Sequence, residues 1–192
     1  MKKRLILLSF LFIGVTVSAQ HVDLIRENAA FVLDSAHFSV HAEVVYRNLS
    51  GSLVNQMMFI PLPVCKEGTK RDTLTVFDVT ANRSIKIPRS QPAGLLFGLA
   101  FEPNQQKKLL ICYTDSHDGK YLTYPLKTQA EFWKGPLAFG SYTLKYDDTV
   151  IAIDSMSTPP DTTVQEGGET ILTWKRSNYT PAREFEIWFH RK

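Results

Sequence analysis

The chain has 192 residues, of which 22 are Lys or Arg and 19 are Asp or Glu, and 44% of them are hydrophobic. Three of the basic residues stand at positions 2–4, so the rest of the chain carries 19 basic and 19 acidic side chains. A chain without net charge offers no electrostatic footprint for nucleic acid, and this apolar content excludes a disordered protein.

The first 20 residues predict an export signal. Residues 2–4 are basic, residues 5–17 are apolar, and the small residues Ser18 and Ala19 follow. This order is typical of a secretory signal peptide, and the apolar core is shorter than the roughly 20 residues that span a bilayer. We therefore expect cleavage near Ala19, a periplasmic, secreted or cell-surface location in a bacterium, and no membrane-spanning segment afterwards.

The stretch from 38 to 63 carries the clearest strand signal. From Phe38 to Tyr46 apolar side chains recur at every second position, which gives a strand one buried face and one wet face. Residues 48–52, with the sequence NLSGS, favour a turn, and the apolar run 53–60 ends at a proline. We predict a β-hairpin here.

Short segments of the same kind follow along the chain. The predicted strands are 21–27, 30–33, 73–80, 84–87, 95–101, 108–114, 121–126, 141–146, 150–154, 170–174 and 184–189, with further hairpins joining 95–101 to 108–114 and 141–146 to 150–154 and with 128–136 irregular. Ten or more short strands separated by turns indicate an all-β, immunoglobulin-like antiparallel β-sandwich. Residues 21–192 are enough for a single domain of this kind, or for two small packed sandwiches.

Two cysteines, Cys65 and Cys112, occur in a chain that is predicted to leave the cytoplasm. An oxidising compartment permits a disulfide between them. Two separate buried thiols fit the sequence equally well, because spacing alone does not establish pairing.

Several short motifs occur in an order that resembles a known group of proteins. The motif YRN at 46–48 precedes FIPLP at 59–63, LLICY at 109–113, YPLKT at 124–128 and WKGP at 133–136. This order resembles exported bacterial β-sandwich domains of unknown function, although the isoleucine in FIPLP departs from their F-P-L-P pattern. The opening is also similar to the non-catalytic N-terminal sandwich of zinc aminopeptidases. The resemblance implies an immunoglobulin-like fold and supplies no catalytic residues.

Motifs of catalysis are missing from the sequence. It contains no Gly-x-Ser-x-Gly, no His-Glu-x-x-His and no glycine-rich phosphate loop. His37 and His41 share one predicted strand face, but at ~3.3 Å per residue they stand about 13 Å apart, too far for one metal ion. We predict a protein that is not an enzyme and that uses no cofactor.

Aromatic residues gather between 121 and 142. An exposed Trp133, with Tyr121 or Tyr124, would stack on a sugar, since loops at the end of a sandwich commonly carry recognition. The alternative is that Trp133 folds inward and fills the open end, because large aromatics contribute strongly to core burial.

The leading hypothesis is a non-enzymatic envelope protein that binds a partner protein through strand edges or end loops. The second hypothesis is a carbohydrate-binding module that uses Trp133, Tyr121 and Tyr124.

Overall fold

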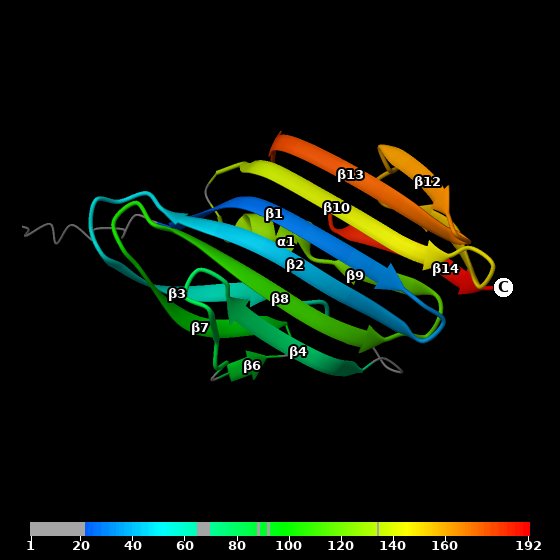
Figure 1. The fold of residues 1–192 in the computed structure, drawn as a ribbon, viewed down its shortest axis with the longest axis horizontal. Helices are drawn as coiled ribbons and strands as arrows, with labels where there is room; N and C mark the ends of the chain where they lie inside the picture. The colour runs from blue at the N-terminus through cyan, green and yellow to red at the C-terminus, as the bar shows by residue number, and fades with distance from the viewer. Residues whose placement is uncertain (1–21, 65–69, 88, 92, 134) are drawn as a thin grey trace, which may run out of the picture.

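β-strands make up nearly all of the regular structure (Figure 1). The computed structural model describes residues 22–192 apart from 65–69, 88, 92 and 134, so the predicted signal peptide and Cys65 lie outside the described residues. The elements are β1 (Val22–Leu33), β2 (His37–Asn48), β3 (Val54–Pro61), β4 (Arg71–Asp78), β5 (Arg83–Ser84), β6 (Arg89–Gln91), β7 (Gly94–Phe101), β8 (Gln106–Ser116), β9 (Tyr121–Tyr124), α1 (Leu126–Glu131), β10 (Leu137–Asp147), β11 (Ile151–Met156), β12 (Thr162–Glu166), β13 (Glu169–Tyr179) and β14 (Phe185–Arg191).

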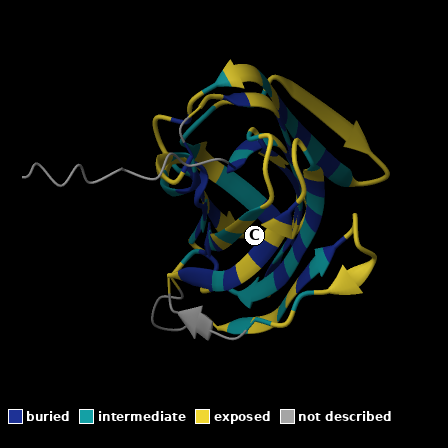
Figure 2. Cartoon of the chain, turned by 90° about the vertical axis from the view of Figure 1, so that its left-hand side faces the viewer, coloured by how far each residue is buried: buried dark blue, intermediate teal, exposed yellow. Residues whose placement is uncertain are grey.

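The strands form one large sheet and two small ones. The large sheet has eight strands in the order β12-β13-β10-β1-β2-β8-β4-β5, and the small sheets have the orders β11-β14-β9 and β3-β7-β6. Hydrogen-bonded neighbours run antiparallel, except that β1 and β10 are parallel. The large sheet is curved, and the small sheets lie across its concave side (Figures 1 and 2). The predicted all-β sandwich is confirmed.

The buried hydrophobic side chains form one cluster, and buried residues occur along the strands of the large sheet and of the small sheets (Figure 2). The alternation predicted from Phe38 to Tyr46 is confirmed, because every second residue of that stretch is at most 2% exposed. Phe185 from β14 stacks on Phe31 of β1 with ring centroids 5.2 Å apart, and it meets Trp174 of β13 edge-on at 4.8 Å. Burying each such side chain contributes about 1.5–3 kcal/mol, which holds the small sheet against the large one.

The predicted hairpins are wrong in their pairing, although their strands exist. β2 pairs with β1 and β8 in the large sheet, whereas β3 pairs with β7 in a small sheet. The strands β7 and β8, and likewise β10 and β11, are also divided between different sheets. Alternation and turn residues identify consecutive strands, but they do not distinguish a hairpin from a chain that crosses between sheets.

Two of these crossings lie side by side. β2 pairs with β8 up to Arg47 and Gln106, and β3 pairs with β7 from Val54 and Phe101 onward. Two antiparallel strands therefore leave the large sheet together and continue together into the small sheet. We call the place where both chains turn, residues 48–53 and 102–105, the corner.

The side chain of Asn48 joins the two chains of the corner. It is fully buried, and its Nδ2 donates to the carbonyl oxygens of Ser52 at 2.8 Å and Glu102 at 2.9 Å. Its Oδ1 accepts from the backbone N–H of Ser50 at 2.9 Å, and its own N–H donates to the Gln105 carbonyl at 2.9 Å. One amide thus satisfies polar groups on both chains.

Part of the segment 128–136, predicted to be irregular, is helical, because α1 covers its first four residues. The carboxylate of Glu184 accepts from the N–H groups of Lys127 at 2.8 Å and Thr128 at 3.0 Å, which satisfies amides that a helix start leaves open. Glu184 is 56 or 57 residues away from these amides, so the sequence next to α1 does not indicate that a helix starts here. Within the described part of the chain, no helix has the length and hydropathy needed to cross a membrane.

Replacing Asn48 with Ala should lower the free energy of unfolding by about 2–3 kcal/mol, because the two chains of the corner lose the hydrogen bonds that this buried amide makes to the carbonyls of Ser52 and Glu102 and from the N–H of Ser50. The matched variant Asn55→Ala, at an exposed position of β3, should change it by less than about 0.5 kcal/mol. Denaturant unfolding measures both values. A loss in Asn48→Ala no greater than that in Asn55→Ala would contradict this role of the corner.

Candidate functional site

The three aromatic residues predicted to bind a ligand do not share one surface. Trp133 is 9% exposed, and its ring lies 4.9 Å from that of Tyr46. Tyr124 is buried against Phe31 in the core. Tyr121 is the partly exposed member, and its ring neighbour is Trp188. Trp133 therefore points inward, as in the second of the two alternatives considered above. Ligand binding by the three residues stays a prediction.

The predicted disulfide would join Cys112, which the structure describes, to Cys65, which lies outside the described residues. Cys112 lies on β8, with its Sγ 3.3 Å from Nδ1 of His41 on the neighbouring β2. Burial raises the pKa of the Cys112 thiol. A thiol that stays protonated at neutral pH is a poor nucleophile. Because Cys65 lies outside the described residues, the disulfide stays a prediction.

An uncharged surface lies on the outer side of two paired strands, β3 and β7, of one small sheet. We call it the β3–β7 face, and it consists of the outward side chains of the β3 segment and of β7 together with Phe132 after α1: Leu53, Asn55, Met57, Phe59, Leu96, Gly98, Ala100 and Phe132. Leu53 and Met57 are 56% and 58% exposed. An antiparallel sheet that faces water on one side ordinarily shows polar residues there, so this surface departs from the usual pattern.

The side chains of the β3–β7 face are packed against one another. The rings of Phe59 and Phe132 lie 4.8 Å apart, which connects β3 with the residue that follows α1. The sulfur of Met57 lies 3.8 Å from the position that a Cβ of Gly98 would occupy, so this side chain covers β7. Contiguous exposed apolar surface of this kind marks interaction sites.

A second exposed aromatic surface lies on the other small sheet. Tyr121 of β9 pairs with Trp188 of β14, and their ring centroids are 5.4 Å apart. The hydroxyl of Tyr121 donates to Oε1 of Glu186 at 2.6 Å. Burial and this hydrogen bond raise the pKa of Tyr121 to about 12, so the phenol keeps its proton. We call Tyr121, Glu186 and Trp188 the aromatic platform.

The alternation of side chains in β14 indicates one residue of the aromatic platform, Trp188, which the sequence-based prediction did not include. In the segment 185–190, Phe185, Ile187 and Phe189 alternate with polar residues and with Trp188, so the tryptophan belongs to the outward side. Its neighbour Tyr121 is 67 positions earlier in the chain, and only strand pairing brings the two together.

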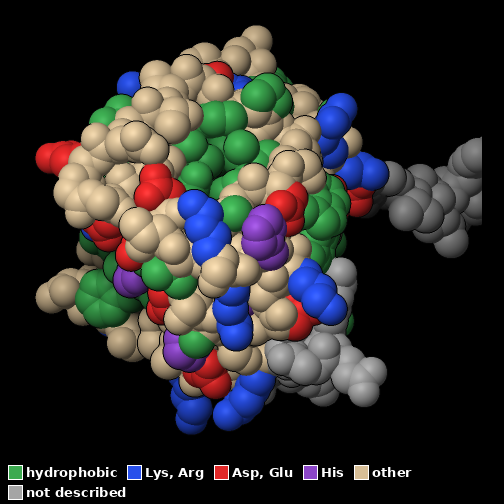
Figure 3. All heavy atoms as spheres, turned by 90° about the vertical axis from the view of Figure 1, so that its right-hand side faces the viewer, with side chains coloured by type: hydrophobic (Ala, Val, Ile, Leu, Met, Phe, Trp, Pro, Cys, Tyr) green, Lys and Arg blue, Asp and Glu red, His purple; other side chains and the backbone are tan. Residues whose placement is uncertain are grey.

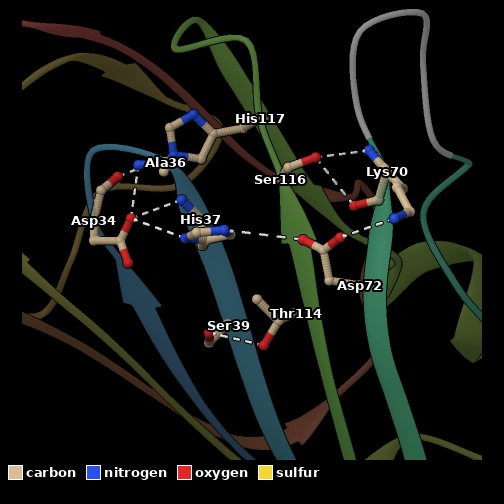
Figure 4. Close-up of polar contacts among 9 residues, drawn as sticks. All are labelled: Asp34, Ala36, His37, Ser39, Lys70, Asp72, Thr114, Ser116 and His117. Atoms are coloured by element: carbon tan, nitrogen blue, oxygen red, sulfur yellow. Dashed lines mark hydrogen bonds and ion pairs between the residues drawn. The ribbon is translucent and has the colours of Figure 1, made fainter.

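A polar cluster closes the β1–β2 turn (Figure 4). Oδ1 of Asp34 accepts from the N–H groups of Ala36 at 2.6 Å and His37 at 2.7 Å. His37 lies between two carboxylates, with Nδ1 3.6 Å from Asp34 and Nε2 3.9 Å from Asp72. Such contacts stabilise a turn and a strand end.

The end of the molecule that carries this turn shows no dominant charge. Lys and Arg side chains are interspersed there with Asp, Glu and His side chains (Figure 3). Within the described ranges, no group of three or more His, Cys, Asp and Glu residues could hold a metal ion.

A carboxyl group lies in the core. Glu27 of β1 is 2% exposed, and it accepts from the hydroxyls of Tyr124 at 2.7 Å and Tyr142 at 2.8 Å. Burial raises the pKa of Glu27, and the hydrogen bonds from the two tyrosines oppose that rise. The carboxyl group connects β1 with β9 and β10. Nothing in the local pattern around residue 27 predicted this arrangement.

The raised pKa of Glu27 has a consequence for stability. The folded protein holds a proton at pH values where the unfolded chain, with its ordinary glutamate pKa of 4.5, has lost it. The free energy of unfolding should therefore fall as the pH rises from 4.5 through the raised pKa. Glu27→Gln should flatten this slope, and Glu102→Gln, at an exposed position, should preserve it. Denaturant unfolding at a series of pH values measures the slope, and an unchanged slope in Glu27→Gln would contradict the assignment.

No protein-family model matches the chain, and no curated protein matches it. Among solved structures, a candidate nutrient-binding protein from Legionella pneumophila has a TM-score of 0.70 at 10% identity, over 88% of this chain and 67% of that one. The M1 zinc metallopeptidase of Deinococcus radiodurans has a TM-score of 0.50 at 9% identity, over 88% of this chain and 42% of the peptidase. A mutant of that peptidase bound to a Tyr-Ser-Ala substrate has a TM-score of 0.51 at 10% identity.

At these identities the likeness concerns the fold alone. The chain spans less than half the length of the metallopeptidase, because the match covers 42% of it. The expected resemblance to the non-catalytic sandwich of zinc aminopeptidases is confirmed as a similarity of fold. The chain is thus similar to a candidate nutrient-binding protein and to one part of a zinc peptidase.

Proposed function

We propose that this chain is an exported, non-enzymatic module that binds a partner protein through the β3–β7 face. The observation that carries the proposal is that the outward side of β3 and β7, with Phe132, presents eight residues of which none is charged. Covering apolar surface contributes roughly 25 cal/mol per Å², so a complementary apolar partner gains most where no charge has to be desolvated.

The geometry of β3 supports a protein partner. β3 forms an edge of its sheet and has eight residues, so among the described residues no strand pairs with one side of its backbone, although α1 contacts part of β3. Met57 and Phe59 alternate along that edge with inward residues, which suits a partner that offers side chains at every second position. The unbranched side chain of Met57 adapts to different partner shapes.

Two further observations support the proposal. The pattern of residues 1–20 predicts export, which puts the partner in the cell envelope or outside the cell. The part of the metallopeptidase that matches makes up 42% of the peptidase chain, so in that protein the fold is joined to other parts of a longer chain.

Met57→Glu should weaken binding of the envelope partner roughly tenfold or more, because a carboxylate placed against an apolar partner costs at least about 1.4 kcal/mol. The matched variant Val164→Glu, at an exposed position of β12, should bind as the wild type does. A partner is first identified by crosslinking in the intact envelope, and its affinity for each purified variant is then measured. Equal affinities for Met57→Glu and the wild type would contradict the proposal.

The aromatic platform favours a second function, carbohydrate binding. Trp188 is 38% exposed, which leaves ring surface for the apolar side of a sugar, and the Glu186 carboxylate next to it accepts hydrogen bonds from hydroxyls. This candidate retains Tyr121 from the sequence-based hypothesis and replaces the buried Trp133 with Trp188.

Trp188→Ala should abolish retention on a polysaccharide that holds the wild-type protein, because the stacking surface is lost. Val32→Ala, which shortens an exposed apolar residue of β1, should leave retention unchanged. Pull-down with a panel of insoluble polysaccharides and a glycan array provide the measurement. If the wild-type protein is retained by none of them, carbohydrate binding is excluded.

A further inference from the structure

Two buried N–H groups near Glu27 have no hydrogen-bond partner among the described residues. They are Nε1 of Trp133 and Nε2 of Gln129. Leaving such a donor unpaired costs about 1–3 kcal/mol, and buried polar groups in native proteins almost always have a partner in the protein or in ordered water. Two such donors near one carboxyl group therefore indicate that something else occupies the space between them.

Both donors and Glu27 line one cavity between α1 and the large sheet. Its volume is about 20 Å³, and the remaining lining residues are Leu24, Leu126, Ala130, Gly135, Leu137 and Pro181. A cavity holds a water molecule when it exceeds roughly 10–15 Å³ and offers two to four polar partners. This cavity meets both conditions, and it is too small for an organic ligand.

The chemistry of the lining selects a neutral occupant. An anion would face the carboxyl group of Glu27, and a cation would face the N–H groups of Trp133 and Gln129. Water accepts two hydrogen bonds and donates two, so it can satisfy the indole and the amide while it donates to the carboxyl group. The Gln129 amide lies close enough to Glu27 to lower its pKa as a side-chain hydrogen-bond donor, and its Nε2 makes no hydrogen bond of good geometry.

We propose that this cavity binds one water molecule that accepts from Trp133 and Gln129 and donates to Glu27. The water connects the end of α1 to β1, and through Tyr124 and Tyr142 it connects α1 to β9 and β10. Phe132 stands directly before Trp133 and belongs to the β3–β7 face, so the water also fixes the position of that side chain. The inference depends on the cavity and its donors and does not require the proposed function.

NMR of the ¹⁵N-labelled protein tests the proposal, because a water molecule bound for longer than nanoseconds gives a water–protein NOE of opposite sign to that of surface water. The three tryptophan indole protons provide matched probes. Trp133 should show the bound-water signal. Trp174, whose Nε1 donates to the Thr158 carbonyl at 3.0 Å, should show none, and the exposed Trp188 should show the surface signal. Absence of the bound-water signal at Trp133 would overturn the proposal.

A variant tests the role of the amide. Gln129→Met removes the donor while keeping the length of the side chain, and it should reduce the bound-water signal at Trp133 at least severalfold. Lys127→Met, at an exposed position of α1, should leave the signal unchanged. An undiminished signal in Gln129→Met would overturn the assignment of Gln129, and the wild-type measurement decides the proposal if that variant does not fold. Electron density of an ion or organic molecule between Trp133 and Glu27 in a crystal structure would also overturn it.

Discussion

The buried amide of Asn48 determines how the sheets of this protein are joined. At the corner, two antiparallel chains turn out of the large sheet, and the Asn48 amide donates to the carbonyls of Ser52 on one chain and Glu102 on the other. A side chain with two donors and an acceptor at one position satisfies both chains. Because the corner directs β3 and β7 beneath the large sheet, it also creates the sandwich interior. The outward side of β3 and β7 becomes the β3–β7 face for the same reason.

The two small sheets contribute differently to the surface. On one, the β3–β7 face presents apolar side chains without charge, which suits a protein partner. On the other, Tyr121 and Trp188 lie beside the Glu186 carboxylate, which suits a ligand with hydroxyl groups. Near them, Glu27, α1 and Trp133 line one cavity, and Phe132 of the β3–β7 face directly precedes Trp133. One of the two exposed surfaces therefore borders the cavity beside the buried carboxyl group of Glu27.

The strands could be predicted because their physical cause is local. The alternation of apolar and polar residues along 38–46 indicates which side chains are buried, and a turn sequence such as NLSGS indicates where a strand ends. Pairing could not be predicted, because a hairpin and a crossing between sheets have the same local pattern. The start of α1 depends on Glu184, and the platform depends on the pairing of Tyr121 with Trp188. In the last two cases the deciding contact joins residues more than 50 positions apart, where periodicity carries no information.

The parallel pairing of β1 with β10 constrains when the chain can fold. Residue Arg26 stands opposite Phe139, and β1 has antiparallel β2 on its other side. The centre of the large sheet therefore cannot close until the chain has been synthesised beyond residue 147, the end of β10. Folding dominated by such distant pairings is slow. Until β10 is present, the edge of β1 that it covers has no strand beside it, so an incomplete chain exposes the centre of the large sheet.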